Sequence, residues 1–226
     1  MRVKLVSYSQ PPYDLETNRE TLDRTDDLIA YCARVSNPQN QTNKETNGRL
    51  LRYLIKNKHW SPFEMCSACL EITTTRDIAR QLLRHRSFSF QEFSQRYSDV
   101  NALDDSFLLR DARLQDLTNR QNSIDNTDTA LDVWWHQQQT WIIENVKRIY
   151  KEALERGIAK EQARAILPEG NTVSKLYVNG TIRSWIHYIE LRSANGTQSE
   201  HMELAREIAK VISTIFPNVK EHTGED

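Results

Sequence analysis

The residues best suited to chemistry in this sequence lie in one short segment, residues 84–99, RHRSFSFQEFSQRYSD. It holds three arginines, one histidine and four serines, with three phenylalanines and one tyrosine among them. Arginine binds phosphate groups through paired hydrogen bonds, and serine and glutamine side chains add further donors. The aromatic rings could stack on a planar ligand or anchor the segment to the core. Three interpretations follow: a solvated basic patch at a helix end, a nucleic-acid contact, or an anion-binding active site.

A second group of charged residues lies in residues 181–193, TIRSWIHYIELRS. Arg183 and His187 are four residues apart and share a face of the predicted helix, whereas Arg192 points elsewhere. By itself this segment favours an ordinary surface helix with solvated charges. Arg164, just before the helix-ending Pro168, is a third candidate for a site residue, but by itself it indicates no function.

The three cysteines are not predicted to carry chemistry. Cys66 and Cys69 form a C-x-x-C pair in EMCSACLEITTT, whose β-branched residues predict a strand. Residues i and i+3 of a strand point to opposite faces, which is poor geometry for one metal ion. We therefore predict small core residues and no metal site.

Composition excludes several classes of protein. The chain has 226 residues and a formal net charge of −1, so no global field attracts nucleic acid or a membrane surface. We find no signal peptide, and no segment approaches the roughly 20 apolar residues of a transmembrane helix. The odd cysteine count implies no disulfide framework and favours a reducing, cytoplasmic location. The motif G-x-G-x-x-G is absent, which argues against a Rossmann dinucleotide-binding domain.

The elements that must position these residues predict an α+β architecture with few strands and several helices. Strands are expected at 2–8 and 65–74, with a short strand or turn at 175–180 and a turn at 59–64. Helices are expected at 21–35, 48–58, 75–86, 128–156, 161–168, 181–193 and 198–215. Residues 37–47 form a polar loop, and residues 99–127 a long insertion with a short helix near 112–118. We interpret residues 1–216 as one domain, followed by a mobile tail at 217–226.

Several collinear segments together resemble the flavin-dependent thymidylate synthases. The segment RHRSFSFQEFSQRYS is similar to that family's signature, Arg-His-Arg followed after seven residues by Ser. HWSPFE, RQLLRHR, ARAILP and IRSWIHYIELR resemble further family segments, in the expected order. The resemblance implies a homotetramer whose subunits share active sites, each with a small, mostly antiparallel sheet and flanking helices. It also implies methylation of dUMP to dTMP, with carbon from methylenetetrahydrofolate and a hydride from FAD that NADPH has reduced.

The resemblance also assigns roles to residues, position by position. Arg192 looks like the catalytic group that binds and polarises the uracil. The residues that look like dUMP contacts are Gln81, Leu82, Leu83, Arg84, Glu92, Phe93, Ser94, Gln95, Arg96, Arg164 and Arg192. Those that look like FAD contacts are Ser61, Arg84, His85, Arg86, Glu92, Thr181, Arg183 and His187. Of these, Leu82, Leu83 and Phe93 would act through packing or backbone, and Gln95 through its backbone N–H. Thr181 departs from the family's usual asparagine, and His59 resembles a histidine near the flavin and the folate path.

Two alternatives stay open at this point. The first is a nucleic-acid-binding module that uses the arginines and interleaved aromatic rings as a stacking platform. The near-neutral charge and the remote matching segments argue against it. The second is a flavoprotein of this fold with a different substrate or a lost activity, because fold does not fix function.

Overall fold

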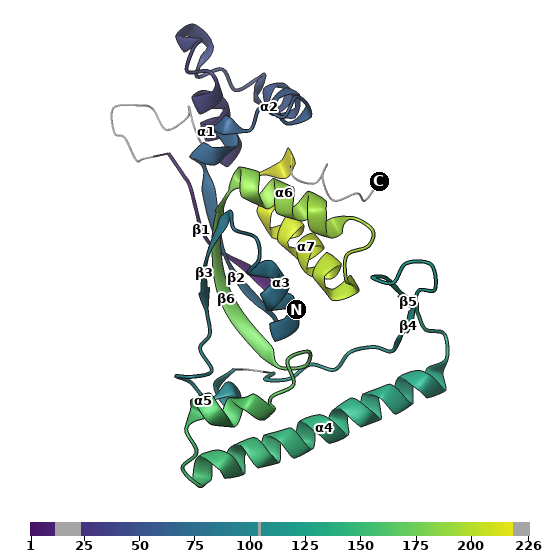
Figure 1. The fold of residues 1–226 in the computed structure, drawn as a ribbon. Helices are drawn as coiled ribbons and strands as arrows, with labels where there is room; N and C mark the ends of the chain where they lie inside the picture. Colours follow the sequence, from purple (N-terminus) through teal and green to yellow (C-terminus); the bar gives the residue numbers. More distant parts are fainter. Residues whose placement is uncertain (12–23, 104, 219–226) are drawn as a thin grey trace.

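The computed structural model describes residues 1–11, 24–103 and 105–218. Its centre is a four-stranded antiparallel sheet of order β1-β2-β6-β3, with helices packed against it (Figure 1). The strands are β1 Arg2–Tyr8, β2 Ser67–Thr75, β6 Val173–Thr181 and β3 Phe88–Glu92. The predicted α+β class with an antiparallel sheet is confirmed.

One face of the sheet carries the main hydrophobic core. Buried residues alternate along β2 and β6, as expected for strands with one covered face. Helices α3 Arg76–Leu82, α6 Ile182–Ser193 and α7 Ser199–Ile212 lie on that face (Figure 1). Trp185 of α6 is fully buried, and its indole N–H donates to the backbone oxygen of Ala68 over 3.1 Å. This bond fixes α6 on the central strands.

The remaining helices surround this unit. Helices α1 Thr25–Ala33 and α2 Asn47–Lys56 lie beyond one end of the sheet, next to the 3-10 helix η3 Ser61–Met65 (Figure 1). The long helix α4 Thr129–Glu155 runs past the other end, beside α5 Lys160–Ala163 and η5 Arg164–Ile166. Two more short 3-10 helices span Pro38–Asn40 and Val100–Ala102. No helix in the described ranges is long and apolar enough to span a bilayer.

The segment after α3 differs from the prediction. The helix expected at 75–86 ends at Leu82, and the supposed loop contains the edge strand β3. Phe88 is buried and Phe90 is partly buried, whereas Ser89 and Gln91 are exposed. This alternation is a strand signal, which the charged residues around it obscured. The phenylalanines therefore anchor the segment to the core.

One further expectation was wrong, and another was confirmed as a strand that is longer than predicted. The helix near 112–118 does not form; instead β4 Arg113–Gln115 pairs with β5 Ser123–Asp125. The carboxylate of Asp116 accepts hydrogen bonds from the backbone N–H groups of Thr118 and Asn119, which stabilises a turn in place of a helix. The segment at 175–180 is part of the nine-residue central strand β6, since pairing on both sides extends it. The helix start at 21–23 and the tail from 219 onward lie outside the described residues.

Candidate active site

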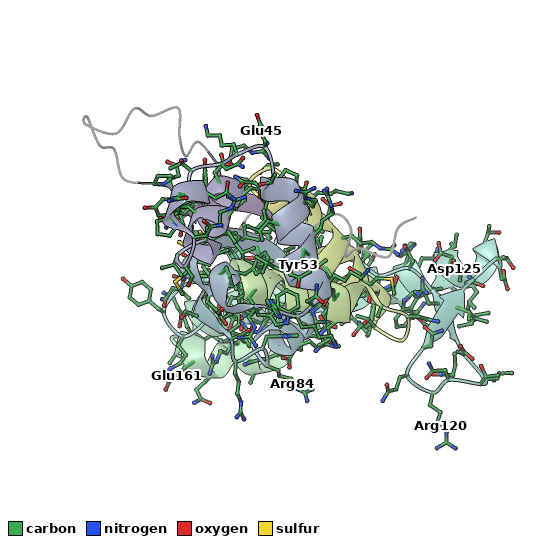
Figure 2. All side chains as sticks on the ribbon, turned by 90° about the horizontal axis from the view of Figure 1, so that it is seen from above. Glu45, Tyr53, Arg84, Arg120, Asp125 and Glu161 are labelled. Atoms are coloured by element: carbon green, nitrogen blue, oxygen red, sulfur yellow. The ribbon has the colours of Figure 1, made fainter. Side chains whose placement is uncertain are left out.

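The residues assigned by resemblance fall into three groups along the fold. The first surrounds the start of α6, the second joins the end of α3 to α6 and α7, and the third lies beside η5. In the view of Figure 2, Arg84 of the second group and Glu161, which lines the third, project outward at the same edge of the molecule. The hairpin that carries Arg120 and Asp125 stands apart from all three groups (Figure 2).

The group at the start of α6 is built on the ion pair of Arg183 and Glu64. Arg183 Nη1 donates to Glu64 Oε1 over 2.5 Å, which joins α6 to η3. Burial alone would raise the pKa of Glu64, but hydrogen bonds from Arg183 and Thr181 and the Arg183 charge hold it below its usual value. The hydroxyl of Thr181 accepts from the backbone N–H of Ser184 over 3.2 Å and caps the helix. The helix N-terminus and the guanidinium thus lie side by side.

Aromatic rings line the same group. The His187 ring lies 4.4 Å from the Trp60 ring, nearly perpendicular to it. Ser61 is exposed at the start of η3. His59 is exposed as well and stacks edge-on against Tyr53 at 6.2 Å. The structure therefore brings Ser61, Thr181, Arg183 and His187 together in one region.

The second group contains the Arg-His-Arg segment. Arg84 and Arg86 are exposed, whereas His85 is half-buried beneath α6. Arg192 Nε donates to His85 Nε2 over 3.0 Å, across 107 residues of sequence. Burial, followed by the charges of Arg192 and Arg84, lowers the pKa of His85 from 6.5 to about 4. His85 is therefore neutral near pH 7 and can accept the hydrogen bond.

Gln81 extends this group toward α7. Its carboxamide bonds Gln198 over 2.7 Å and His201 over 3.1 Å. Leu82 is fully buried and Leu83 is partly buried, so both side chains serve the core. The group thus presents Gln81, Arg84 and Arg192 around the end of α3.

The third group is a pocket rich in arginine. A cavity of about 380 Å³ is lined by Arg76, Arg80 and Arg164, with Gln95 and Glu161 at its wall. Gln95 is 4 % exposed, and its buried Nε2 has no hydrogen-bond partner among the described residues. A buried donor without an acceptor is costly, so an anion in this pocket would satisfy it. The Gln95 residue therefore lies at the wall of this pocket with an unsatisfied side-chain donor.

The other residues of the third group lie around this pocket. Glu92 accepts from the Ser174 hydroxyl over 2.8 Å and lies 3.5 Å from Arg76. Arg96 is exposed and lies 3.4 Å from Glu161. Ser94 is also exposed, whereas Phe93 is partly buried. Sequence reasoning left Arg76 and Arg80 without a role, although their i, i+4 spacing on one helix signalled a shared face.

The first and third groups do not meet within one chain. Thr181 ends β6 beside the first group, and Val173 begins β6 beside the third. Nine extended residues separate these points by roughly 26 Å. A single nucleotide cannot reach both from one position.

Among the described residues, one group of three has potential metal-ligand spacing. Asp111, Asp132 and His136 place ligand atoms within 4.8 Å of one another. His136 already lies 3.5 Å and 3.7 Å from the two carboxylates, so each is partly neutralised when the imidazole is protonated.

Together these features define a class of protein: a helix-covered antiparallel sheet with separate groups of arginine side chains, whose donors suit phosphate groups. The chain belongs to the family described as thymidylate synthase complementing protein (Thy1), whose model matches residues 19–218.

Individual relatives agree with this assignment. The chain is 47 % identical to a probable flavin-dependent thymidylate synthase of Paramecium bursaria Chlorella virus 1, over 97 % of both chains. It is also 47 % identical, over 97 % of both chains, to the flavin-dependent thymidylate synthase of Synechocystis sp.. Among solved structures, it is similar to a UMP/dUMP methylase, PolB, from Streptomyces cacaoi bound with 5-Br dUMP. That match has a TM-score of 0.79 and 26 % identity, and it covers 98 % of this chain and 93 % of PolB.

The donor set of the first two groups fits a flavin dinucleotide. A pyrophosphate needs guanidinium groups and N–H donors, and Arg84, Arg86 and Arg183 are exposed or partly exposed near a capped helix N-terminus. The rings of Trp60 and His187 add an aromatic surface beside it. These residues can hold the cofactor that the relatives' names imply.

Proposed function

We propose that this protein is a methyltransferase that converts dUMP to dTMP, with methylenetetrahydrofolate as carbon donor and NADPH as reductant of bound FAD. Family membership supports this, and so does the identity with relatives over nearly the whole chain. The structural observation that carries it is the bond between Arg192 and His85. It joins two of the segments that carry the family resemblance, those containing His85 and Arg192, into one site.

Arg192 is the residue we propose as catalytic. Its Nε is bound to His85, and no hydrogen bond joins its terminal Nη groups to another described residue. Those donors can therefore bind a carbonyl oxygen of the uracil ring. Charge that develops on that oxygen as C5 attacks the carbon donor would be stabilised by the fixed guanidinium. His85 holds the guanidinium in place because it is neutral and accepts from Nε.

No thiolate is positioned to activate the ring instead. Burial raises the pKa of the Cys66 thiol to about 12, and it raises the pKa of Cys32 and Cys69 as well. Cys66 adjoins the first group, because its backbone oxygen accepts from Ile182 at the start of α6, but the residue is buried in the main core. Electrostatic activation by arginine is therefore the route that the chain's own residues support.

FAD, once reduced, supplies the hydride that completes the methyl group. The chain's part is to bind the cofactor, through Ser61, Arg84, His85, Arg86, Thr181, Arg183 and His187. The Arg183–Glu64 pair and the Thr181 cap fix the N-terminus of α6, so its N–H groups and the guanidinium would be available to hold the pyrophosphate. Glu92 lies nearer to the third group, which supports a role toward dUMP in preference to FAD.

The arginine pocket is the proposed site of the dUMP phosphate. Gln95, Arg96 and Arg164 would bind it, with Ser94 at the rim. Because β6 separates this pocket from the α6 group by roughly 26 Å, one nucleotide would use the phosphate pocket of one subunit and the flavin of another. This geometry supports a homotetramer with shared sites.

The surface of α4 also supports assembly. This helix exposes a run of large apolar side chains: Val133, Trp134, Trp135, Trp141, Ile142 and Ile149. Large exposed apolar surfaces mark contacts with other chains. We further propose one catalytic domain over 1–216, since the main core draws on residues from Ile29 to Phe216, and a cytoplasmic location.

The decisive experiment measures flavin and turnover together. The purified protein should be yellow and should release tritium from C5-labelled dUMP only when methylenetetrahydrofolate and NADPH are both present. A colourless protein that FAD cannot reconstitute would refute the proposal. UMP should be tested in parallel, because PolB is a UMP/dUMP methylase; methylation of UMP at an equal rate would show a broader substrate range than the one proposed.

A further inference from the structure

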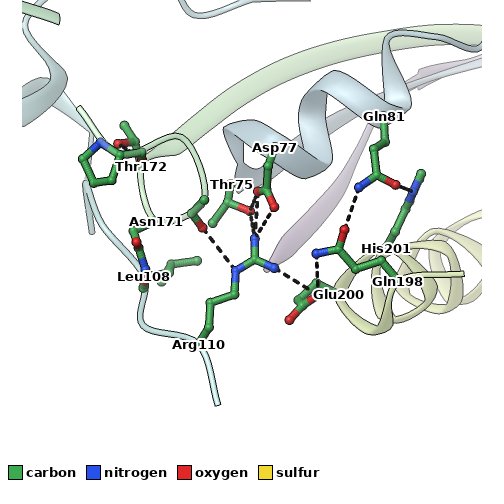
Figure 3. Close-up of polar contacts among 12 residues, drawn as sticks. Thr75, Asp77, Gln81, Leu108, Arg110, Asn171, Thr172, Gln198, Glu200 and His201 are labelled. Atoms are coloured by element: carbon green, nitrogen blue, oxygen red, sulfur yellow. Dashed lines mark hydrogen bonds and ion pairs between the residues drawn. The ribbon is translucent and has the colours of Figure 1, made fainter. Parts of the chain in front are cut away.

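A chain of side-chain hydrogen bonds runs from α7 to the end of α3 (Figure 3). Glu200 Oε2 accepts from Gln198 Nε2 over 2.9 Å, and Gln198 Oε1 accepts from Gln81 Nε2 over 2.7 Å. Gln81 Oε1 then lies 3.1 Å from His201 Nδ1, and His201 Nε2 lies 3.0 Å from the Tyr188 hydroxyl. The chain joins five polar side chains, of which His201 and Tyr188 are buried.

The direction of this chain follows from its carboxylate end. An ionised carboxylate can only accept hydrogen bonds, so Gln198 must turn its NH₂ group to Glu200 and its oxygen to Gln81. Gln81 must then turn its NH₂ group to Gln198 and its oxygen to His201. The proton of neutral His201 is thereby required at Nδ1, and Nε2 accepts from Tyr188. One charged group thus determines every orientation along the chain.

Two features keep Glu200 ionised and His201 neutral. Burial alone would raise the pKa of Glu200, but a backbone N–H, Arg110 and Gln198 hold it below its usual value. His201 is fully buried, and this burial lowers its pKa to about 3. The chain therefore has the same direction across the neutral pH range.

Arg110 ties this chain to the long insertion. Its Nη1 lies 3.0 Å from Glu200, and its Nη2 donates to Asp77 over 2.7 Å and 2.9 Å (Figure 3). The backbone of Arg110 exchanges two hydrogen bonds with the buried Gln139 of α4, at 2.9 Å and 2.8 Å. Asp77 and Gln81 are four residues apart on one face of α3. Arg110 of the insertion therefore bonds Asp77 directly, and it is linked to Gln81 through Glu200 and Gln198.

We propose that Glu200 is a positioning residue for substrate binding: through Gln198 it fixes the Gln81 carboxamide so that Gln81 offers an N–H to the nucleotide. One Nε2 hydrogen of Gln81 is bound to Gln198 and one lone pair of Oε1 to His201. The second hydrogen is the donor that remains, and it suits an acceptor such as a ring carbonyl. This inference rests on the proposed function, because that function makes Gln81 a dUMP contact. Arg110 supports Glu200, which gives the insertion a structural role in the site.

The first test needs no substrate. The ring nitrogens of His201, observed by ¹⁵N NMR of the complete protein, should show the proton on Nδ1 at neutral pH. Glu200→Gln has nearly the same shape but can donate as well as accept, so the chain loses its imposed direction and a share of the Nε2–H form should appear. Glu152→Gln is the matched control, since Glu152 also pairs with an arginine but lies on α4. A proton on Nε2 in the unmodified protein, or an unchanged tautomer in Glu200→Gln, would overturn the inference.

The second test measures binding. Glu200→Gln should raise the KM for dUMP about threefold to tenfold, the worth of one hydrogen bond, with kcat within about twofold. The rate of flavin reduction by NADPH should not change, and Glu152→Gln should change neither constant. Gln198→Met should act in the same direction. The double variant Glu200→Gln/Gln198→Met should have a KM for dUMP no higher than that of the weaker-binding single variant, because both changes break the same chain. A KM that rises by the product of the two single effects would contradict the proposal.

The two tests separate the inference from the function on which it rests. If the protein does not bind dUMP, the proposed function fails, yet the His201 tautomer and its response to Glu200→Gln are still measurable. If dUMP is methylated but its KM is the same in Glu200→Gln and the parent protein, the function stands and the positioning role of Glu200 is refuted.

Discussion

Gly180 is the position where one added carbon should disturb both the core and the site. It lies opposite Phe88 in the pairing of β3 and β6. A Cβ built on Gly180 would lie 2.3 Å and 2.4 Å from two ring carbons of Phe88. The φ angle of Gly180 is not in the left-handed region, so Gly180→Ala acts through this contact and not through backbone strain.

The Phe88 ring has little room to move. It is 8 % exposed, and its centroid lies 4.4 Å from that of Trp185 and 6.0 Å from that of Tyr188. Overpacking of a filled core costs about 1–3 kcal/mol. For a chain of this size each kcal/mol lowers the unfolding temperature by about 2–4 °C. Gly180→Ala should therefore lower the unfolding temperature by about 2–12 °C, and weaken FAD binding because Phe88 anchors the Arg-His-Arg segment.

The assay is thermal unfolding, combined with a double-mutant cycle. Phe88→Leu removes the ring carbons that the new methyl group meets, so Gly180→Ala should cost about 1–2 kcal/mol less in that background. Gly170→Ala is the control, since nothing lies within 4 Å of the position of its Cβ, and it should stay within about 0.5 kcal/mol of the parent. An unfolding temperature for Gly180→Ala equal to the parent's, or strict additivity with Phe88→Leu, would refute this reasoning.

Three further predictions concern the site. Arg183→Gln should weaken FAD binding at least about tenfold, since hydrogen bonds to charged groups contribute about 1.5–3 kcal/mol; a flavin fluorescence titration measures this, with exposed Arg156→Gln as control. The pKa of His85 falls from 6.5 unfolded to about 4 folded, so its contribution to stability is complete above pH 6.5 and is lost as the pH falls toward 4. As the pH falls from 6.5 toward 4, the urea midpoint of unfolding should therefore fall less steeply in His85→Gln than in the parent protein. His201 is present in both proteins and contributes equally to both. Iodoacetamide at slightly alkaline pH should leave turnover unchanged, because burial raises the pKa of all three thiols, that of Cys66 to about 12; rapid inactivation would point to a thiol in the mechanism.

The sequence alone determined the residue types at the site and most of the helices. Helix α4 was predicted within one residue at each end, because Asp128 caps its start and local periodicity continues to Glu155. The arginines, serines and glutamines of the site are local facts too, and their collinear motifs identified the family that the comparisons show.

Other features depended on which distant segments meet, and local patterns do not hold that information. Strand β3 forms because its short alternating run pairs with the free edge of β6, where Glu92 lies opposite Leu176, more than 80 residues later in the chain. The hairpin β4–β5 depends on the Asp116 turn, which competes with helix formation. Neither strand β3 nor the hairpin β4–β5 can be predicted from the pattern of a few neighbouring residues.

The site itself shows the same division. The sequence named Arg192, His85 and Gln81 as functional, but only the tertiary structure decided that Arg192 is bound to His85 and Gln81 to α7. It also gave Arg110, in a segment without a recognisable pattern, two carboxylate partners from α3 and α7. Side-chain type sets which chemistry is available, because it is a property of the residue. Orientation, protonation and partners are set by neighbours that are remote in the chain, and therefore by the fold.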